Sequence, residues 1–555
     1  MKRNFIKIPV FALGLALSAM TLNSCVKDEE TSITEPTRYT SSDVKSYADL
    51  FKVFWTVMDQ RYNYFYEQKR ADGMDWNAVY REYYPKFAAL KTFGRSTDND
   101  RDINDDKLKA VQYFTEIVDP IIDRHFNVKV AMPATNNSVI TTYTFWGGMK
   151  TKGHNIYPFS SKYGYMKNRL TGNVLLQENF LLAGNLKSNP DIYYFSFAQF
   201  ALASNFKIDL LDKYLTPDPG NGLVLTTADI DASKELSAIK DATFRKKVRD
   251  FTVNILNQWN AFPASGEVKT FNDQISSFKS TEIISSAFLD ATQKALDKSK
   301  NLVAYNSGAT YAPVLTAESL PYIQWFVSKM GTHAQWGYRL PQFQTAAQDI
   351  LDNEPLYTGF FNPLRKGNIK KIIIDLRGNG GGAVVDARFF TDRFVTKPAV
   401  WGYQRTKEGN GQFNYTPWVP MQANPHQFGI PANIPIVILT DKGSASMSEM
   451  STMMIKSQGS QVISVGDYSA GATAGLGSPD DFNGGTRDQI AGYLTFYMPL
   501  MAAKDASGQV IEGVGVKPDI FVEPPTDAEV AAMQSSPNTF VDRVLNEAVK
   551  YLSGK

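Results

Sequence analysis

Serines crowd a strand–turn–helix boundary within the stretch Ile436–Ala474. A β-branched run ends at a glycine there, and methionines at helical spacing follow it. Ser444, Ser446 and Ser448 therefore lie at or just inside a helix N-terminus, where unpaired backbone N–H groups and the helix dipole favour a developing negative charge. The pattern predicts a nucleophile site. The alternative is that Ser444 only caps the helix, with Glu449 in its first turn.

A serine hydroxyl becomes a useful nucleophile when a base takes its proton, and neutral histidine is suited to that task. The chain has only four histidines: His125, His154, His333 and His426. His125 lies where a helical pattern at 108–121 gives way to an alternating strand at 128–130, a junction that favours a functional side chain on a rigid scaffold. The alternative is an ordinary surface or hydrogen-bonded histidine.

A glycine loop follows a buried strand at 371–375 and runs through Gly378, Gly380 and Gly381. With Ala383 it matches G-x-G-x-x-A before a helix, the pattern of a dinucleotide site. The segment after that helix lacks a clean second strand that ends in a ribose-binding acid, so a nucleotide-dependent oxidoreductase is the weaker alternative. The stronger interpretation is that loop amides bind an oxyanion.

The elements that must position these residues divide the chain into several parts. Residues 43–130 read as an N-terminal helical domain that contributes the histidine. Residues 131–203 are a mixed segment in which only a buried strand at 191–197 has a clear pattern. A mostly helical insertion follows, and an α/β pattern of strand, glycine loop, helix, strand, serine turn and helix completes the chain. The predicted boundaries are 1–24 (leader), 25–42 (tether), 43–130, 131–203, 204–345 (insertion) and 346–555 (α/β core).

The N-terminus has a charged start, an apolar run and then Leu22-Asn23-Ser24-Cys25. This is similar to the lipobox of a bacterial lipoprotein, and Cys25 is the only cysteine in the chain. We expect lipidation of Cys25 and an outer membrane lipoprotein, on the cell surface or on the periplasmic face. An acidic run at 27–30 resembles a surface-export signal. The alternative is an ordinary signal peptide.

Composition excludes several other classes of protein. A single cysteine permits no disulfide and no cysteine-based metal site within one chain. The formal net charge of +2 includes Lys2, Arg3 and Lys7 of the leader, so the remaining chain carries −1 and has no basic excess for nucleic acid. Beyond the leader, no apolar run is long enough to cross a bilayer.

Three separated pieces resemble one family: IIDLRGNGGG at 373–382, KGSASMSEM at 442–450 and EGVGVKPDI at 512–520. They are similar to the C-terminal-processing serine peptidases, tricorn-like branch, and IIDRHFNV near 125 resembles the lipoprotein-type members. The resemblance implies a ClpP/crotonase-like core, with Ser446 as nucleophile, Ser444 as fallback, His125 as base and Glu512 as its partner.

For this chemistry, loop amides around Gly380 and Gly381, with the amide of Met447, are the predicted oxyanion hole, and neither metal nor cofactor is expected. Processing peptidases of the other branch use a lysine as base, but Ala472 stands at that place, so a Ser–Lys dyad is not expected. The tricorn peptidase has an aspartate directly after its serine, where this chain has Met447.

We therefore expect a serine peptidase that cleaves proteins or peptides through an acyl-enzyme on Ser446. The alternative is a catalytically inactive, peptidase-like surface lipoprotein that binds peptide or glycan. No peptide-binding PDZ domain is recognisable, so the insertion at 204–345 is a candidate lid or substrate gate.

Overall fold

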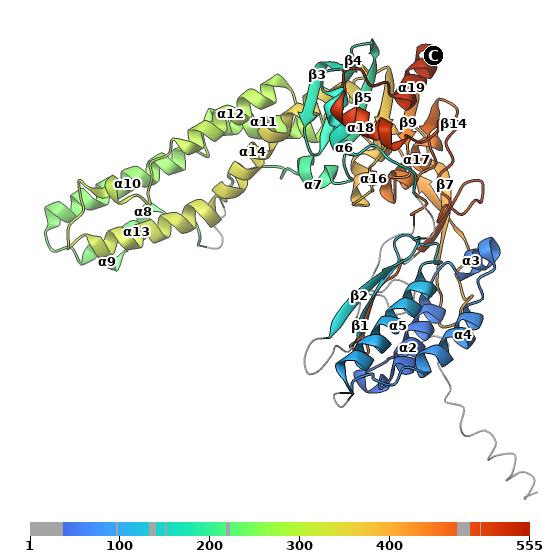
Figure 1. The fold of residues 1–555 in the computed structure, drawn as a ribbon. Coiled ribbons are helices and arrows are strands. Elements are labelled where there is room, and N and C mark those ends of the chain that lie inside the picture. The colour runs from blue at the N-terminus through green and yellow to red at the C-terminus, as the bar shows by residue number, and fades with distance from the viewer. Residues whose placement is uncertain are drawn as a thin grey trace, which may run out of the picture. The chain divides into compact units, whose positions relative to one another are not determined.

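The computed structural model describes residues 37–95, 98–132, 140–149, 153–217, 222–473, 489–499 and 501–555. The predicted leader, Cys25 and most of the predicted tether lie outside these residues. The chain forms two compact units (Figure 1). The first consists of Met1–Gly153, Val400–Met421 and Ala470–Val516, and the second of His154–Ala399, Gln422–Ser469 and Lys517–Lys555. Each unit therefore combines segments that are far apart in the sequence.

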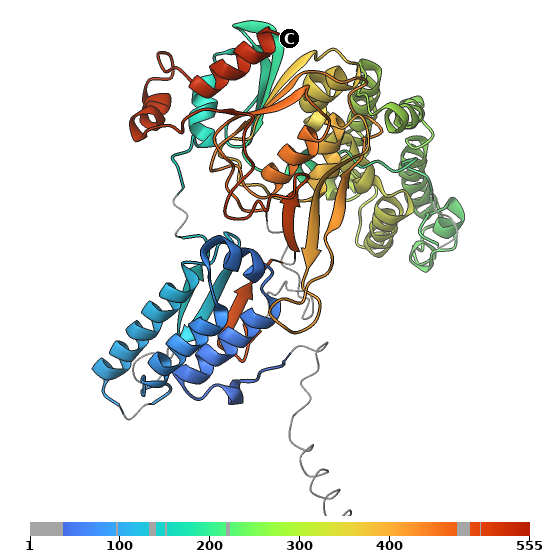
Figure 2. The ribbon, with the colours of Figure 1, turned by 90° about the vertical axis from the view of Figure 1, so that its right-hand side faces the viewer.

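The first unit contains a four-stranded antiparallel sheet of order β11-β12-β1-β2 with helices packed on it (Figure 2). Its elements are η1 (Ser41–Asp43), α2 (Tyr47–Arg61), α3 (Phe65–Asp72), α4 (Trp76–Ala88), α5 (Asp100–Val118), β1 (Asn127–Met132), β2 (Thr141–Trp146), β11 (Gln489–Ile490) and β12 (Leu494–Tyr497). A further sheet, of order β13-β7-β8, comprises β7 (Ala399–Thr406), β8 (Val419–Ala423) and β13 (Met501–Asp505).

Aromatic side chains join the helices of the first unit to its sheet. The ring of Phe54 on α2 meets Phe114 of α5 edge to face, with centroids 5.3 Å apart, and stacks on Phe496 of β12 at 5.9 Å. All three side chains are buried. Such pairs add to the free energy gained by burying apolar area. Because β12 pairs with β1, this core also holds β1 and the residues just before it.

The second unit is built on a seven-stranded sheet of order β14-β10-β9-β6-β5-β4-β3. Neighbouring strands from β5 to β14 run parallel, whereas β3, β4 and β5 are antiparallel. The strands are β3 (Leu170–Gln177), β4 (Leu181–Leu186), β5 (Asn189–Phe197), β6 (Lys371–Asp375), β9 (Ile436–Thr440), β10 (Val462–Gly466) and β14 (Ile520–Phe521). Every residue of β9 is buried, as expected for a central parallel strand with both faces covered.

Helices surround this sheet. They are α6 (Phe159–Met166), α16 (Val385–Phe389), η6 (Thr391–Phe394), α17 (Met447–Lys456), α18 (Asp527–Ser535) and α19 (Arg543–Ser553). Because β6, β9 and β10 are parallel, their carboxyl ends lie at one edge of the sheet, the edge at which α/β proteins place their ligands. The loops that follow these three strands carry the glycines, the serines and Asp467.

A helical arm belongs to the same unit (Figure 1). Its helices are α7 (Leu202–Phe206), α8 (Thr227–Asp231), α9 (Lys234–Ser237), α10 (Ala242–Ala261), α11 (Gly266–Thr281), α12 (Ser286–Lys300), η3 (Gly308–Tyr311), α13 (Leu320–Thr332), η4 (His333–Gly337), α14 (Leu340–Leu356), η5 (Tyr357–Phe361) and α15 (Asn362–Arg365). Its outer helices share a separate hydrophobic core that includes Ile230, Leu256 and Phe326. At its base, Arg393 Nη2 donates to Glu282 Oε1 at 2.8 Å.

The α/β core expected from the sequence, with N-terminal helices and a helical insertion, is confirmed. Parallel strands alternate with helices in the second unit, and α2 to α5 precede them in the chain. Within the ranges that the structure describes, no helix is both long and apolar enough to span a membrane.

Candidate active site

The turn predicted to carry the nucleophile, called the nucleophile turn below, joins β9 to α17 in the second unit. Ser446 is the N-cap residue of α17 and has φ 54° and ψ −115°, a conformation that residues with a Cβ rarely adopt. Backbone strain of this kind costs about 1–3 kcal/mol and persists only where the surroundings impose it, as at active sites. A serine on a strained strand-to-helix turn is the arrangement that exposes a nucleophilic hydroxyl.

The three candidate serines differ in what surrounds their hydroxyls. Ser444 is buried and donates to the carbonyl oxygen of Leu376 at 2.8 Å. Ser448 is buried and donates to the carbonyl oxygen of Asn379 at 2.7 Å. Ser446 is partly exposed. The helix cap also falls on Ser446 rather than on Ser444, so Ser446 is the serine best placed for chemistry.

Asp441 holds the nucleophile turn against the glycine loop. Its Oδ1 accepts the backbone N–H of Gly378 at 2.8 Å and that of Gly443 at 2.9 Å. The N–H of Ala445 donates to the carbonyl oxygen of Asn379 at 3.1 Å and adds a second connection between the loops. A single carboxylate that accepts an N–H from each loop fixes their spacing, because ionised acceptors form the stronger hydrogen bonds.

Gly381 lies directly against Ser446, the predicted nucleophile. Its φ is +91°, and a Cβ placed on it would lie 2.7 Å from Ser446 Cβ and 2.8 Å from the backbone nitrogen of Met447. Only glycine fits both the backbone conformation and this close approach. The glycine loop is thus packed against the serine turn, as an oxyanion-binding role requires.

The three amides predicted to bind the oxyanion differ in whether they already have a hydrogen-bond acceptor. The N–H of Gly381 donates to Asn379 Oδ1 at 2.9 Å, so it already has an acceptor within its loop. Across the described part of the chain, the N–H groups of Gly380 and Met447 have no hydrogen-bond acceptor. These two amides therefore remain the best candidates, and Met447 adds the free N–H of the first helical residue.

Glu449 holds the backbone of Ser446, a role that the sequence does not reveal directly. The side chain is fully buried; its Oε2 accepts the N–H of Ser446 at 3.0 Å and its Oε1 accepts the hydroxyl of Ser469 at 2.6 Å. The S-x-x-E spacing from Ser446 to Glu449 is the signal in the sequence, because it is typical of a capping box. The carboxylate fixes the backbone of the strained residue.

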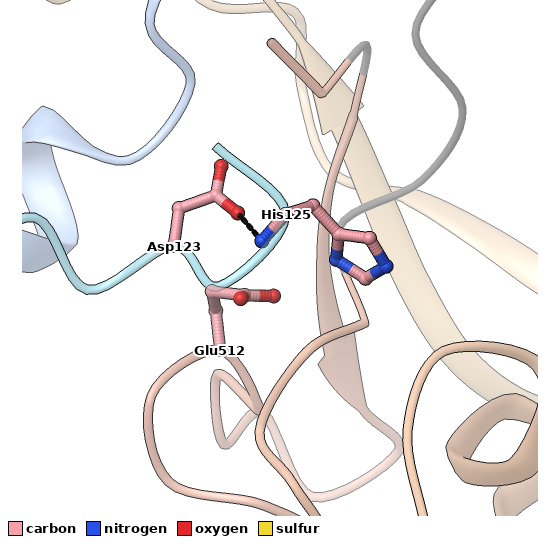
Figure 3. Close-up of side chains that lie close together, drawn as sticks. All are labelled: Asp123, His125 and Glu512. Carbon is pink, nitrogen blue, oxygen red and sulfur yellow. Dashed lines mark hydrogen bonds between the residues drawn. The ribbon is translucent and has the colours of Figure 1, made fainter. Parts of the chain in front are cut away.

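The first unit brings together two predicted residues that are far apart in the sequence, His125 and Glu512 (Figure 3). His125 lies just before β1, and Glu512 follows β13. With Asp123 they form a group in which one nitrogen or oxygen atom from each side chain lies within 4.8 Å of the others. Figure 3 shows the carboxylate of Glu512 pointing toward the imidazole ring of His125.

Backbone amides hold Glu512 in this position. Its Oε1 accepts the N–H of Arg124 at 3.1 Å, and its Oε2 accepts the N–H of Thr473 at 2.9 Å. The side chain is almost fully buried. A carboxylate fixed in this way next to an imidazole can orient the ring and stabilise its protonated form.

Asp123 is a second residue that the sequence analysis missed. It is buried, and its Oδ1 accepts the N–H of His125 at 2.8 Å and that of Phe126 at 3.1 Å. This Asx turn sets the backbone direction at His125. The D-x-H spacing is the signal that could have revealed it.

Burial shifts the pKa values of both His125 and Asp123. Burial, with a smaller contribution from the charge of Arg124, lowers the pKa of His125 to about 4. Burial also raises the pKa of Asp123 to about 7, against the opposing hydrogen bonds from His125 and Phe126. His125 is therefore neutral near pH 7, the form that can accept a proton.

Two carboxylates and an imidazole are also a possible set of metal ligands. In this group, however, both oxygens of Glu512 and one oxygen of Asp123 already accept backbone N–H groups. The arrangement fits an oriented base better than a metal centre. Ser446 with its two loops belongs to the second unit, and His125 with Glu512 to the first.

Comparisons with known proteins agree with the motifs. The model of peptidase family S41 matches residues 337–522. A search of curated proteins gives no match. Among solved structures, a candidate peptidase from Parabacteroides merdae is 14% identical, with 92% of this chain and 97% of that chain covered and a TM-score of 0.45.

Two further structures show the same kind of likeness. The photosystem II D1 C-terminal processing protease is 18% identical over 32% of this chain and 42% of its own, with a TM-score of 0.23. The tricorn protease is 15% identical over 40% of this chain and 20% of its own, also with a TM-score of 0.23. All three TM-scores lie below 0.5. The match to the model of peptidase family S41 covers residues 337–522, less than half of the chain, and includes the turn at Ser446, the glycine loop and Glu512.

Proposed function

We propose that this protein is an active serine peptidase that cleaves peptide bonds in proteins or peptides through an acyl-enzyme on Ser446. The observation that carries the proposal is the convergence of His125 and Glu512 in the first unit. A local pattern cannot produce that convergence, because the two residues are far apart in the sequence. The second observation that supports the proposal is Ser446 itself, which is strained, partly exposed and next to a glycine loop.

In the proposed mechanism, neutral His125 accepts the proton of the Ser446 hydroxyl as the oxygen attacks the peptide carbonyl. Glu512 stabilises the imidazolium that forms. The amides of Gly380 and Met447 bind the oxyanion of the tetrahedral intermediate. The imidazolium then protonates the departing amine, and a water molecule, activated by the same histidine, hydrolyses the acyl-enzyme. None of these steps requires a metal ion or a nucleotide.

The direct test compares the wild type with Ser446→Ala. We expect a fluorophosphonate probe to label the wild type at Ser446, and we expect cleavage of β-casein, an unstructured protein, to fall at least about a thousandfold in the variant. Ser457→Ala, at the residue that directly follows α17, serves as the matched control and should cleave like the wild type. Ser444→Ala tests the fallback serine and should still be labelled at Ser446.

Two results would contradict this assignment. Equal cleavage by the wild type and Ser446→Ala would show that another residue is the nucleophile. No labelling and no cleavage by a folded wild type would favour the alternative of an inactive, peptidase-like binding protein.

We also propose that Cys25 carries a lipid and anchors the protein to the outer membrane. The support is the lipobox-like sequence Leu22-Asn23-Ser24-Cys25 at the end of an apolar leader. A lipid on one N-terminal residue attaches a protein to a membrane surface without spanning it.

A further inference from the structure

The second unit contains an imidazole–carboxylate pair of its own, formed by His154 and Asp467. His154 Nδ1 lies 2.5 Å from Asp467 Oδ2. The two side chains differ sharply in exposure, 47% for His154 and 3% for Asp467. A buried carboxylate therefore holds a ring that is about half exposed to solvent.

The pair lies at the carboxyl edge of the central sheet, next to the nucleophile turn. Asp467 directly follows β10; its backbone N–H donates to the carbonyl oxygen of Thr440 at 3.0 Å, and its own carbonyl accepts the Thr440 hydroxyl at 2.9 Å. Thr440 is the last residue of β9, and the turn that leads to Ser446 begins at the next residue. This is the edge at which α/β folds bind ligands.

The chain that follows His154 crosses both loops of the site. A Cβ on Gly443 of the nucleophile turn would lie 2.9 Å from Ile156 Cδ1. A Cβ on Gly378 of the glycine loop would lie 2.6 Å from the carbonyl oxygen of Tyr157. His154 is thus the start of a segment that lies directly on the loops around Ser446.

The hydrogen bond from His154 Nδ1 to Asp467 determines whether the other ring nitrogen, Nε2, accepts or donates a hydrogen bond. With Nδ1–H donated to the carboxylate, Nε2 of the neutral ring accepts a hydrogen bond, and Nε2–H of the protonated ring donates one. An extended peptide presents both N–H and C=O groups along its backbone. A half-exposed pair of this kind contributes little to stability, so fold stability does not account for its precise placement at the site.

We propose that His154 is a substrate-binding residue that hydrogen-bonds, through Nε2, to the backbone of a polypeptide beside the bond that Ser446 attacks. Asp467 is the positioning residue that orients the ring. This inference rests on the proposed peptidase function, since the polypeptide is the substrate of the same site. It assigns His154 a binding role distinct from the proton transfer proposed for His125.

The test compares His154→Gln and Asp467→Asn with His426→Gln, the same change at a half-buried histidine elsewhere in the second unit. Three quantities are measured: the rate of fluorophosphonate labelling at Ser446, KM and kcat for cleavage of fluorescein-labelled β-casein, and the affinity of labelled β-casein for each variant in the Ser446→Ala background. Thermal unfolding confirms that each variant is folded.

We expect His154→Gln to raise KM and to weaken β-casein binding by about three- to tenfold, the effect of losing one hydrogen bond. Labelling by the small probe should stay within about twofold of the wild type, because the probe has no peptide backbone to bind. Asp467→Asn should show a smaller shift in the same direction, and His426→Gln should show none.

Unchanged KM and unchanged β-casein binding in His154→Gln would overturn the inference. Loss of labelling in that variant would show that His154 is the base, and would overturn both this assignment and that of His125. If the wild type binds β-casein without cleaving it, and His154→Gln weakens that binding, the binding role stands while the proposed peptidase activity fails. If the wild type neither binds nor cleaves, both fail.

Discussion

At the residue scale, the site depends on backbone that is held in place by buried polar side chains. Ser446 has a positive φ, Glu449 accepts its N–H, and Asp441 accepts one N–H from each of the two loops. These bonds form before any substrate arrives, so no further ordering is needed when negative charge develops on the substrate oxygen. Preorganisation of this kind is the largest single contribution in many enzymes.

Gly381→Ala tests the contact between the glycine loop and the nucleophile. The added methyl group would clash with the backbone around Ser446, and alanine is strained at a φ of +91°. We expect fluorophosphonate labelling to slow at least about a hundredfold, comparable to the loss of one oxyanion donor.

The control is Gly164→Ala in α6, where a Cβ would have no neighbour within 4 Å. Alanine is the better helix former, so this variant should be as stable as the wild type or more stable by up to about 1 kcal/mol. Equal labelling by both alanine variants would show that the glycine loop does not form part of the site.

The acid limit of activity should reflect the burial of His125. A protonated imidazole cannot accept the serine proton, and burial lowers the pKa of His125 to about 4. The labelling rate at Ser446 should therefore stay high as the pH falls through 6.5, the ordinary value for histidine, and reach half its maximum at about pH 4.

The sign of the stability effect follows from the same pKa. Between about pH 4 and 6.5 the unfolded chain binds a proton at His125 that the folded chain does not, so this group lowers stability as the pH falls. Circular dichroism must therefore confirm that the protein stays folded at each pH. A midpoint near pH 6.5 in the folded protein would contradict the assignment of His125 as a buried base.

At the element scale, the helical arm is anchored to the elements beside the nucleophile helix. Arg393 of η6 pairs with Glu282 at the end of α11, and Thr391 of the same η6 is 2.8 Å from Ser451 of α17, hydroxyl to hydroxyl. Within the arm, the side chain of Asn362 exchanges hydrogen bonds with the backbone of Ile284. The arm is therefore joined to the core at its base, while its outer helices have their own hydrophobic core.

We predict that the arm gates access of protein substrates. Replacing residues 204–345 by a short flexible linker should change the rate or the selectivity of protein cleavage, whereas fluorophosphonate labelling should remain, because a small probe needs no gate. Glu282→Gln, which breaks the ion pair at the base without shortening the arm, provides a second variant with an intact chain. Unchanged cleavage of β-casein and of a folded protein by both variants would contradict the gating role.

At the scale of the whole molecule, each compact unit holds one part of the proposed machinery. The first contains the histidine and its carboxylate, and the second contains the serine, the glycine loop and the arm. The chain passes repeatedly between the units, since residues 400–421 and 470–516 return to the first. The two parts of the machinery are thus joined by several chain segments rather than by one linker.

The predicted lipid anchor at Cys25 also concerns the whole molecule. Cys25→Ala removes the only thiol that could carry a lipid. We expect the wild type to incorporate a clickable palmitate analogue and to sediment with outer membranes, and we expect the variant to do neither, while its purified form still cleaves β-casein. Membrane sedimentation of the variant at the wild-type level would contradict the lipid anchor.

The sequence by itself determined the local features of this protein. The strand, turn and helix around Ser446, the glycine loop after 371–375 and the junction at His125 all follow from short-range periodicity and turn residues. The mixed segment 131–203 gave no clear pattern beyond one buried strand. The structure pairs β3 with β4 and β4 with that strand, β5, in the central sheet, and the β3–β4 pairing has a register shift between Thr171 and Leu175. A strand whose apolar alternation is interrupted in this way carries a weak signal.

Only the tertiary structure decided which side chains meet. It separated Ser446 from Ser444 and Ser448 because the latter two donate to Leu376 and Asn379, which come from another strand and its loop. It likewise brought His154 to Asp467 and Glu512 to His125. Hydrogen bonds and burial depend on distances between residues that are remote in the chain, whereas a sequence pattern reports only on neighbours along it.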